Sequence, residues 1–367
     1  MKSARPWLLP LVPLYRLGLA ISESRSKPIR RLRRPVISIG NLSTGGAGKT
    51  PLTIALAKAL TARGLHVDVL SRGYGRRSAL PLMVDPEGTA EDFGDEPLVI
   101  AREAGVPVYV AADRYQAGMM AEAALSNPAL TLSEPVLKGH EAVSKGDEAV
   151  LKGHDFSRAA SRSPDQGALA PEGSIHLLDD GFQHRHLARG IDILLLNRED
   201  WNDSLLPAGN LREPPKAAHR ANIIAIPADD PKFESELRAW GWQGTIWRLH
   251  RRMGVPSIEG PVAAFCGIAR PEQFFAGLEA AGLHVASRTA FPDHHRYVQH
   301  DLDCLLDAAR NVGATAFITT EKDLARLGSL SEPLSAKIPL KTAGLCIEID
   351  DEDAALDNLL GSSAFVD

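Results

Sequence analysis

Short apolar runs alternate with amphipathic segments along most of this chain, and the alternation predicts an α/β fold with a mostly parallel sheet flanked by helices. The β-branched residues in the runs indicate buried strands. The predicted strands are residues 36–39, 67–70, 106–110, 175–178, 191–196, 221–226, 262–267, 284–287 and 315–319. The predicted helices are residues 51–63, 97–104, 271–281 and 301–311, with one more that ends at Leu125.

The same pattern divides the chain into parts. We expect an N-terminal segment at 1–34, a P-loop domain at 35–228, a connector at 229–260 and a smaller C-terminal α/β domain at 261–367. Residues 127–172 interrupt the alternation. Within them, residues 135–141 are echoed by 149–155, and the composition is rich in Gly, Ser, Lys, Glu and Pro. We interpret this stretch as a low-complexity insertion.

The N-terminal segment combines an apolar stretch, residues 7–21, with many cations. Residues 1–35 hold nine Lys and Arg and one Glu, a charge of +8, which leaves −13 for the remainder of a chain whose net charge is -5. The stretch is too short and too charged to span a bilayer, so we expect a helix in the plane of an anionic membrane surface. A signal peptide and a helix packed on the core are the alternatives. The side chains expected to face lipid are Leu14, Leu17, Leu19 and Ile21.

Composition narrows the classes of function. A hydrophobic content of 44% is ordinary for a soluble globular protein. The net charge of -5 gives no reason to expect nucleic acid as a partner, and no obligatory protein partner is indicated. The cysteines Cys266, Cys304 and Cys346 lie far apart, so neither a zinc site nor a disulfide framework is expected.

Residues 35–53 carry the clearest chemistry, because a β-branched run is followed by a glycine-rich loop, Gly-Lys-Thr and a helical pattern. This is the order of a P-loop, in which backbone N–H groups and the helix dipole hold phosphate. We expect Lys49 to reach the β- and γ-phosphates of ATP and Thr50 to bind Mg²⁺. Ser43 departs from the pattern, since a P-loop normally has glycine there. The residues expected to contact the nucleotide are Thr44, Gly45, Gly46, Ala47, Gly48, Lys49, Thr50 and Pro51.

Acidic residues lie next to predicted strands and helices. Asp179 and Asp180 follow an apolar strand, where a carboxylate would lie near Mg²⁺. Asp95 precedes Pro97 at the start of a helix, and it is either a simple N-cap or a catalytic base or metal ligand. Residues 71–77 hold two glycines, a tyrosine and three arginines, which favour either an anion-binding loop or a basic surface turn.

Several motifs together resemble those of tetraacyldisaccharide 4'-kinases, the lipid A 4'-kinases of Gram-negative bacteria. They are Gly40-Asn41-Leu42, Ser71-Arg72-Gly73-Tyr74, Gly94-Asp95-Glu96-Pro97, Leu178-Asp179-Asp180-Gly181-Phe182-Gln183-His184, Leu206-Pro207-Ala208-Gly209-Asn210-Leu211-Arg212-Glu213-Pro214, Phe291-Pro292-Asp293-His294 and Thr320-Glu321-Lys322-Asp323. The resemblance covers nearly the whole chain except residues 127–172. The two strings around Phe182 and Asn210 are far more specific than the P-loop.

The resemblance implies transfer of the ATP γ-phosphate to the 4'-hydroxyl of a tetraacylated glucosamine disaccharide 1-phosphate, by a peripheral enzyme on the cytoplasmic face of the inner membrane. It implies that Asp95 is the general base, assisted by His294 across a cleft that closes. Glu96, Asp179 and Asp180 become candidates for the Mg²⁺ site. The residues implied at the sugar and its 1-phosphate are Tyr74, Arg114, Gln183, His184, Arg212 and Glu213. Those implied on the adenine side are Lys322 and Asp323.

Two other functions share part of this pattern. Partitioning and insertion ATPases also carry Gly-Gly-Ala-Gly-Lys-Thr, although they have a second lysine where this chain has Thr44. A membrane-bound nucleotide sensor without catalytic activity is the other alternative. Phosphorylation of a lipid disaccharide acceptor would separate the kinase from both.

Overall fold

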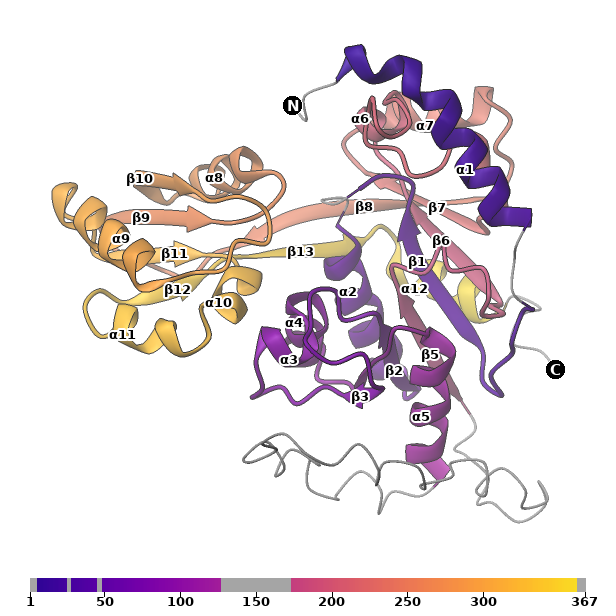
Figure 1. The fold of residues 1–367 in the computed structure, drawn as a ribbon, viewed down its shortest axis with the longest axis horizontal. Helices are drawn as coiled ribbons and strands as arrows, with labels where there is room; N and C mark the ends of the chain where they lie inside the picture. The colour runs from indigo at the N-terminus through magenta and orange to yellow at the C-terminus, as the bar shows by residue number, and fades with distance from the viewer. Residues whose placement is uncertain (1–4, 25–27, 45–47, 127–172, 362–367) are drawn as a thin grey trace, which may run out of the picture.

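A nine-stranded sheet forms the larger of two units in the computed structural model, which describes residues 5–24, 28–44, 48–126 and 173–361 (Figure 1). In sheet order the strands are β13 (Gly344–Ile349), β8 (Thr245–Gly254), β7 (Ile223–Pro227), β6 (Ile191–Leu195), β1 (Val36–Asn41), β5 (Ser174–Asp179), β2 (His66–Ser71), β4 (Val108–Val110) and β3 (Leu82–Met83). Only the edge pairs β3–β4 and β8–β13 are antiparallel among these described strands. The predicted mostly parallel sheet is confirmed, and the predicted insertion at 127–172 lies outside the described residues.

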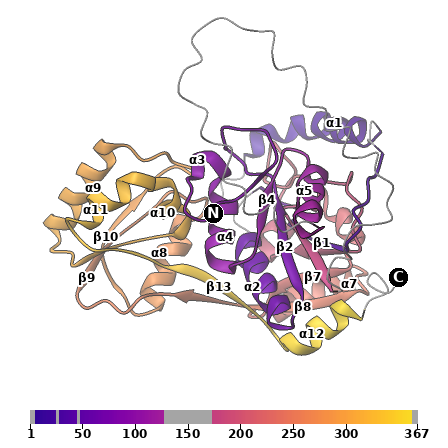
Figure 2. The ribbon, with the colours of Figure 1, turned by 90° about the horizontal axis from the view of Figure 1, so that it is seen from below.

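Helices cover both faces of this sheet (Figures 1 and 2). In β6, Ile193 belongs to one hydrophobic core and Leu194 to the other, because successive side chains of a strand point to opposite faces. The helices on the first face are α2 (Lys49–Ala62), α4 (Asp95–Ala104) and α12 (Glu352–Leu360). Those on the second face are α5 (Arg114–Ser126) and α7 (Pro231–Ala239). Shorter helices are α3 (Ala90–Phe93), α6 (Arg198–Trp201) and the 3₁₀ helix η4 (Pro215–Arg220).

Strand β1 lies between β5 and β6, and its position determines where a site can form. The chain runs from β1 to β2 on one side, while the connection from β5 to β6 passes across β1 to the other side. Ligands of open α/β sheets bind where the order of strands reverses in this way, at the carboxyl ends of the strands. Asn41, Ser71 and Asp179 end β1, β2 and β5, so the topology gathers the groups that follow them.

The smaller unit is a sheet of four parallel strands beside the first sheet (Figure 1). Its strands, in order, are β10 (His284–Ala290), β9 (Pro261–Cys266), β11 (Ala316–Thr319) and β12 (Leu340–Thr342). One face packs against α8 (Pro271–Ala280) and the other against α9 (Gln299–Asn311). The connection from β11 to β12 contains α10 (Glu321–Leu327), η5 (Gly328–Leu330) and α11 (Ser331–Ser335).

Strands β8 and β13 join the two units. Strand β8 falls within the connector expected at 229–260, yet it pairs with β7 in the larger sheet. Strand β13 returns from the smaller unit and pairs antiparallel with β8 before the chain enters α12. The C-terminal part of the chain therefore contributes a strand and a helix to the larger unit, which the sequence pattern did not indicate.

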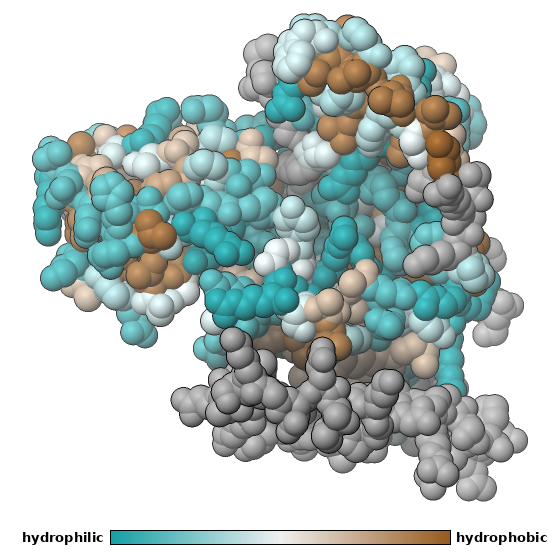
Figure 3. Space-filling view, viewed as in Figure 1, coloured by the Kyte–Doolittle hydropathy of each residue, from teal (hydrophilic) through white to brown (hydrophobic). Residues whose placement is uncertain are grey.

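The N-terminal segment folds as the 3₁₀ helix η1 (Pro6–Leu11) and the helix α1 (Val12–Ser24). Leu8, Val12, Tyr15 and Leu19 lie half-buried along one face. Leu19 was expected to face lipid, and that expectation is wrong because the helical period places it on the side of Tyr15. The exposed large apolar side chains of this segment are Trp7, Leu9, Leu11, Leu14, Leu17 and Ile21. Figure 3 shows hydrophobic side chains gathered over α1.

Contacts on the inner face tie this segment to the larger unit. The Tyr15 hydroxyl donates to the Arg212 carbonyl at 3.0 Å, and the Arg5 N–H donates to the Ala208 carbonyl at 2.9 Å. Within the described residues, no helix is both long enough and apolar enough to cross a membrane.

Candidate active site

The loop after β1 brings Lys49 to the carboxyl end of the sheet. Gly48 has φ +91°, a left-handed conformation that suits glycine, and it precedes Lys49 at the start of α2. The buried Lys49 Nζ donates to Asn41 Oδ1 at 3.2 Å and lies 3.6 Å from Asp180 Oδ1. The Lys49 ammonium is therefore held where the N-terminus of α2 and the end of β1 meet.

The neighbouring residues of the loop differ in their surroundings. Thr50 is buried and Pro51 is half-buried in the first turn of α2. The Thr44 N–H donates to the Asn210 carbonyl at 2.8 Å. Gly45, Gly46 and Ala47, which are expected to contact the nucleotide, lie outside the described residues.

Asp179 ends β5 as a buried carboxylate. Its Oδ2 accepts a hydrogen bond from the Ser71 hydroxyl at 3.2 Å, whereas its Oδ1 has no hydrogen-bond partner in the described part of the chain. Burial, together with the charges of Glu96 and Asp180, raises the pKa of Asp179 to about 7. A buried acceptor without a donor provides one ligand for a cation.

Asp180 follows with a different environment and a left-handed backbone, φ +49°. Arg212 Nη1 donates to its Oδ2 at 3.0 Å. Burial alone would raise the pKa of Asp180, but the charges of Lys49 and Arg212 outweigh burial and hold it below its usual range. The pKa values of the two adjacent carboxylates are thus shifted in opposite directions, because Asp180 lies close to Lys49 and Arg212 whereas Asp179 is buried beside other acidic groups.

These donors fit a Mg²⁺ ion. The unpartnered Asp179 oxygen, the Thr50 hydroxyl and the half-buried Glu96 are hard oxygen ligands. Within the residues that the structure describes, no three Asp, Glu, His or Cys side chains are grouped closely enough to hold a metal by themselves. A sparse set is the arrangement that Mg²⁺ commonly uses, because water and substrate phosphates complete its octahedron.

Asp95 faces the smaller unit from the first turn of α4. Arg326 Nε donates to Asp95 Oδ2 at 2.8 Å, and His294 Nδ1 lies 3.4 Å from the same oxygen. Gly94 occupies the N-cap position, and the Asp95 side chain caps no turn but accepts the N–H of Glu96 at 3.0 Å. The interpretation of Asp95 as a simple N-cap is therefore wrong.

Charges around Asp95 decide its protonation. Burial alone would raise its pKa, but the hydrogen bond with His294 and the charges of Arg326 and Lys322 outweigh burial and hold the pKa well below its usual range. Asp95 is therefore ionised at neutral pH, which is the state a general base requires.

His294 sits between Asp95 and Arg326 with a left-handed backbone, φ +60°. Its hydrogen bond with Asp95 raises the pKa of the imidazole. The Arg326 Nη2 lies 3.2 Å from the same Nδ1, which donates to Asp95 when protonated and accepts from Arg326 when it is not. The Tyr74 ring packs against the His294 imidazole, with the two ring centroids 5.6 Å apart.

Helix α10 supplies a second ion pair beside the first. Lys322 Nζ donates to Glu96 Oε1 at 2.6 Å, one helical turn before Arg326. Asp323 is fully buried, and its carboxylate accepts from the Gly267 N–H at 3.0 Å and lies 3.2 Å from Arg326 Nη1. Asp323 therefore orients Arg326 from within the smaller unit.

Arg114 forms a second electropositive spot, and His184 lies near it as a neutral imidazole. Arg114 is buried, its Nε has no hydrogen-bond partner among the described residues, and burial together with the charge of Arg72 lowers its pKa. Burial and the charge of Arg114 lower the pKa of His184 to about 4. A buried guanidinium with an unused donor is suited to an anionic group of a ligand.

The remaining residues expected at the substrate differ in how many of their polar atoms are already hydrogen-bonded and in how exposed they are. Gln183 Nε2 donates to the Asn41 carbonyl at 2.8 Å, and its Oε1 accepts from Arg212 at 3.3 Å. Glu213 is buried against Arg220, which donates to it at 2.7 Å, so it fixes the loop that carries Arg212. Tyr74 is 64% exposed and open to a ligand.

A cleft of about 700 Å³ between the two units is lined by some of these groups, whereas Asp95, Asp179 and Asp180 and the residues expected at the sugar are not among its lining residues. The larger unit lines it with Lys49, Thr50 and Glu96, and the smaller unit with His294, Lys322 and Arg326. The structure thus brings together residues that are widely separated in the sequence.

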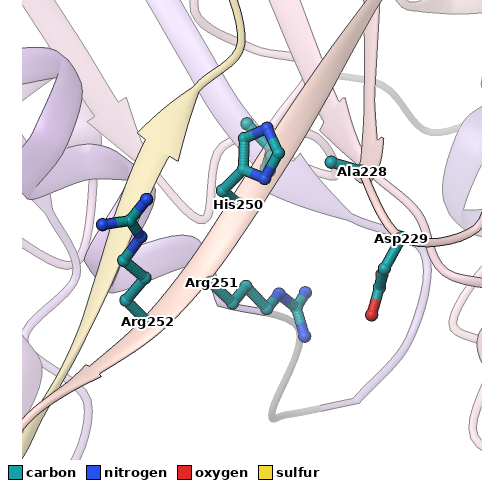
Figure 4. A pocket seen from close by; sticks show the side chains of 6 residues that line it. Ala228, Asp229, His250, Arg251 and Arg252 are labelled. Carbon is teal, nitrogen blue, oxygen red and sulfur yellow. The ribbon is translucent and has the colours of Figure 1, made fainter.

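Arg251 of β8 also lines this cleft. A Cβ atom at Gly48 would lie 3.6 Å from its Nη2. A second hollow of about 180 Å³ is formed by Arg251 with Ala228, Asp229 and their neighbours. Figure 4 shows Arg251 and Asp229 on the same side of β8 and Arg252 on the other.

Sequence reasoning missed Arg326 and Arg251. Neither belongs to a recognisable motif, and the contact of Arg326 with Asp95 joins the two units. The available signal for Arg326 was its spacing of four residues from Lys322, which places both cations on one face of a helix. Arg251 lies in a strand that the pattern did not predict.

The fold and this geometry define a class: α/β proteins that hold phosphate-bearing ligands between a helix N-terminus and the carboxyl ends of parallel strands. The family model of tetraacyldisaccharide-1-P 4'-kinases matches residues 4–363, and the chain belongs to this family. It is 37% identical over 366 residues to the tetraacyldisaccharide 4'-kinase of Koribacter versatilis, which covers 96% of this chain and 97% of that protein. It is 34% identical over 364 residues to the enzyme of the same name from Rhodopseudomonas palustris strain BisA53. That match covers 94% of this chain and 88% of the other protein.

A solved structure agrees with this assignment. The crystal structure of LpxK from Aquifex aeolicus, described as an "apo" form in complex with ATP, matches with a TM-score of 0.65 and 27% identity over 97% of this chain and 98% of that one. The family and the kinase class that the motifs implied are confirmed. The partitioning ATPase and the non-catalytic sensor were wrong alternatives.

Proposed function

We propose that the cleft between the two units is where this kinase transfers the γ-phosphate of ATP to the 4'-hydroxyl of a tetraacylated disaccharide 1-phosphate. The reaction follows from family membership. The observation that supports the location is the convergence on one cleft of Lys49 from the larger unit and His294 from the smaller one. Lys49 and the loop before it supply positive charge and N–H donors for the phosphates.

Asp95 and His294 are placed to handle the proton of the acceptor. Asp95 is ionised and accepts the hydroxyl proton, while His294, 3.4 Å away, orients the carboxylate and stabilises its charge. Because His294 belongs to the smaller unit, the pair is complete only when the two units are close together.

The phosphate end of the substrate has its own group of residues. Arg114 and His184 bind the 1-phosphate, since the Arg114 Nε has no other partner among the described residues. Tyr74 and Arg212 contact the sugar, and Gln183 and Glu213 hold the surrounding loops in place.

Thr50, Glu96, Asp179 and Asp180 would hold Mg²⁺ directly or through water. The ion neutralises charge on the phosphates when it is bound. The loop residues 44–51 would cradle the phosphates. The roles of Lys322 and Asp323 on the adenine side remain predictions from the motif.

Lys49→Ala tests the location of the phosphate site. We expect kcat/KM for ATP, measured as phosphorylated disaccharide by mass, to fall by on the order of 10²-fold or more, because a charged clamp on the transition state is lost. Lys232→Ala removes the same charge from an exposed position of α7 and should retain activity. A folded Lys49→Ala enzyme with normal turnover would exclude this loop as the phosphate site.

We further propose that η1 and α1 place the enzyme on the cytoplasmic face of the inner membrane as a peripheral protein. The segment turns Trp7, Leu14 and Leu17 outward, at 73%, 67% and 57% exposure, while Tyr15 anchors its inner face. Apolar side chains on one side and arginines in the following segment are typical of helices that lie on anionic membranes.

Leu14→Glu with Leu17→Glu tests this without disturbing the core. We expect binding to anionic vesicles to weaken and the KM for lipid substrate to rise, with ATP binding unchanged. Val312→Glu, at an exposed apolar position of the smaller unit, is the control. Vesicle binding equal to that of the wild type would assign the apolar face another role.

A further inference from the structure

A continuous line of buried hydrogen bonds leads away from Lys49 toward the smaller unit. Lys49 Nζ donates to Asn41 Oδ1 at 3.2 Å, and Asn41 Nδ2 donates to the Ser43 hydroxyl at 3.0 Å. The Ser43 hydroxyl donates to Asp200 Oδ2 at 2.8 Å, and Arg270 Nη2 donates to Asp200 Oδ1 at 3.0 Å. Asn41, Ser43 and Asp200 each have one hydrogen-bond partner on either side in this line. The line begins at the charged Lys49 and ends at the charged Arg270.

Only one arrangement of donors and acceptors fits this line. An ammonium group only donates, so the Asn41 amide must present its oxygen to Lys49 and its nitrogen to Ser43. The Ser43 hydroxyl must then donate its hydrogen bond to Asp200, since a carboxylate only accepts. Asn41, Ser43 and Asp200 are 1%, 0% and 5% exposed, so water does not compete for these bonds.

The line crosses between the two units. Asp200 lies in α6 of the larger unit, and Arg270 precedes α8 of the smaller unit. Arg270 is well buried, its side chain being 14% exposed, and its other acidic neighbour is Glu199 at 3.7 Å. The position of the smaller unit is therefore connected, through one ion pair and three hydrogen bonds, to the Lys49 ammonium.

Ser43 explains why the loop departs from the usual glycine pattern. A glycine at this position would leave Asn41 Nδ2 without its acceptor and would remove a donor from Asp200. Ser43 does not have positive φ, so its backbone does not require glycine. The hydroxyl is thus an addition to the loop with a function of its own.

We propose that Asp200, through Ser43 and Asn41, is a positioning residue for Lys49, and that Arg270 couples this positioning to the docking of the smaller unit. The proposal rests on the phosphate-binding role proposed for Lys49. Arg270 fixes Asp200, Asp200 fixes the Ser43 proton, and the oriented Asn41 amide holds the ammonium in line with the phosphates. When the units separate, Asp200 loses its guanidinium partner and Lys49 loses its fixed position.

Ser43→Gly gives a sharp test, because it brings the loop closer to the standard pattern and breaks the line. We expect kcat/KM for ATP to fall about tenfold, as for loss of a hydrogen bond in a charged network, whereas Ser43→Thr keeps the hydroxyl and should restore most of the activity. Asp200→Asn and Arg270→Gln should each cause a loss of similar size. Arg288→Gln, which removes an exposed ion pair within the smaller unit, is the matched control.

A double-mutant cycle separates positioning from general destabilisation. Because Ser43→Gly and Arg270→Gln interrupt one line, their combined effect on kcat/KM should be clearly smaller than the product of the two single effects. Independent, multiplying losses, or a Ser43→Gly enzyme as active as the wild type, would overturn the proposal. Lys49→Ala measured in parallel distinguishes the two hypotheses, since an active Lys49→Ala enzyme contradicts the phosphate-binding role instead.

Discussion

At the scale of single residues, Asp95 is held by groups from the other unit on two sides. His294 and Arg326 both contact its Oδ2, and Arg326 is itself fixed by the buried Asp323. The guanidinium keeps the carboxylate ionised but also makes it a weaker base, because a pKa that is lowered reduces proton affinity. His294 and Arg326 therefore act on the same atom in the same direction, since both lower the pKa of Asp95.

Alanine at Asp95 and at His294 should each reduce kcat strongly with little effect on ATP affinity. Because both act on one proton transfer, the double variant should lose much less than the product of the single losses. The measurement is a double-mutant cycle on kcat with melting temperatures recorded in parallel. Losses that multiply, or that follow the melting temperature, would assign the pair a structural role and make Asp179 or Asp180 the next candidate base.

Arg326→Gln should move the acidic limb of the pH–rate profile to higher pH. The charge of Arg326 lowers the pKa of Asp95, so its removal raises that pKa and Asp95 becomes protonated, and inactive as a base, at a higher pH than in the wild type. Arg326→Lys keeps the charge and should shift the limb less. An acidic limb that is the same in all three enzymes would show that Asp95 does not control it.

Local spacing was sufficient to predict some of these residues but not others. Lys49 begins the helix that follows β1, and Asp179 and Asp180 stand at the end of β5, so the chain itself fixes their position at the sheet edge. Arg326 reaches Asp95 over 231 positions of sequence. A contact of that kind depends on how two units dock, and residue pattern alone does not encode it.

At the scale of elements, a buried histidine connects three segments of the larger unit. His176 of β5 lies 2.6 Å from Asp68 of β2 and 3.7 Å from Glu122 of α5. Glu122 also accepts the N–H of Arg33 at 2.6 Å, which ties the segment after α1 to the sheet. Burial alone would lower the pKa of His176, but its hydrogen bond to Asp68 and the nearby charge of Glu122 raise it to about 9.

This raised pKa predicts a loss of stability in alkaline solution. A group whose pKa is higher in the folded state stabilises fully below the unfolded value, about 6.5 for histidine, and the effect disappears as pH rises through about 9. The free energy of unfolding should fall in this window by up to about 1.4 kcal/mol per pH unit more in the wild type than in His176→Gln. Urea unfolding of both proteins at several pH values between 6 and 9.5 measures the difference, and a constant difference would contradict the charge assigned to His176.

Most core strands were predictable because both of their faces are buried, which requires continuous apolar runs. Strand β8 was not, since it extends beyond its partner β7 and carries exposed arginines and a histidine along its second half. Its position is set by pairing with β7 and β13, and not by an apolar pattern of its own.

At the scale of the whole molecule, ion pairs connect the two units in the described part of the chain, in addition to β8 and β13. They include Arg270 with Asp200, Lys322 with Glu96, and Arg326 with Asp95. Each places a cation of the smaller unit on a carboxylate near the phosphate loop or the candidate base. In the proposed site, docking of the units would therefore also complete the active site, and closure would exclude water from the transfer.

Glu96 has two proposed roles that a charge swap can separate. As a partner of Lys322 it ties the units together at 2.6 Å, and as a carboxylate near Asp179 it is a candidate for the Mg²⁺ site. Glu96→Lys and Lys322→Glu alone should each lower stability by about 1 kcal/mol or less, because this pair is only partly buried and each change sets like charges side by side.

The double variant Glu96→Lys with Lys322→Glu restores the pair in reverse and should recover most of the melting temperature. Its kinase activity should remain lower by on the order of 10²-fold, because a cation now stands where a carboxylate would face Mg²⁺ and the phosphates. The equivalent swap of Glu234 and Arg248, an ion pair within the larger unit at 2.9 Å, should leave activity unchanged. If the Glu96–Lys322 swap is stable and fully active, Glu96 serves only to join the two units, and the metal is held by Thr50, Asp179 and Asp180 without it.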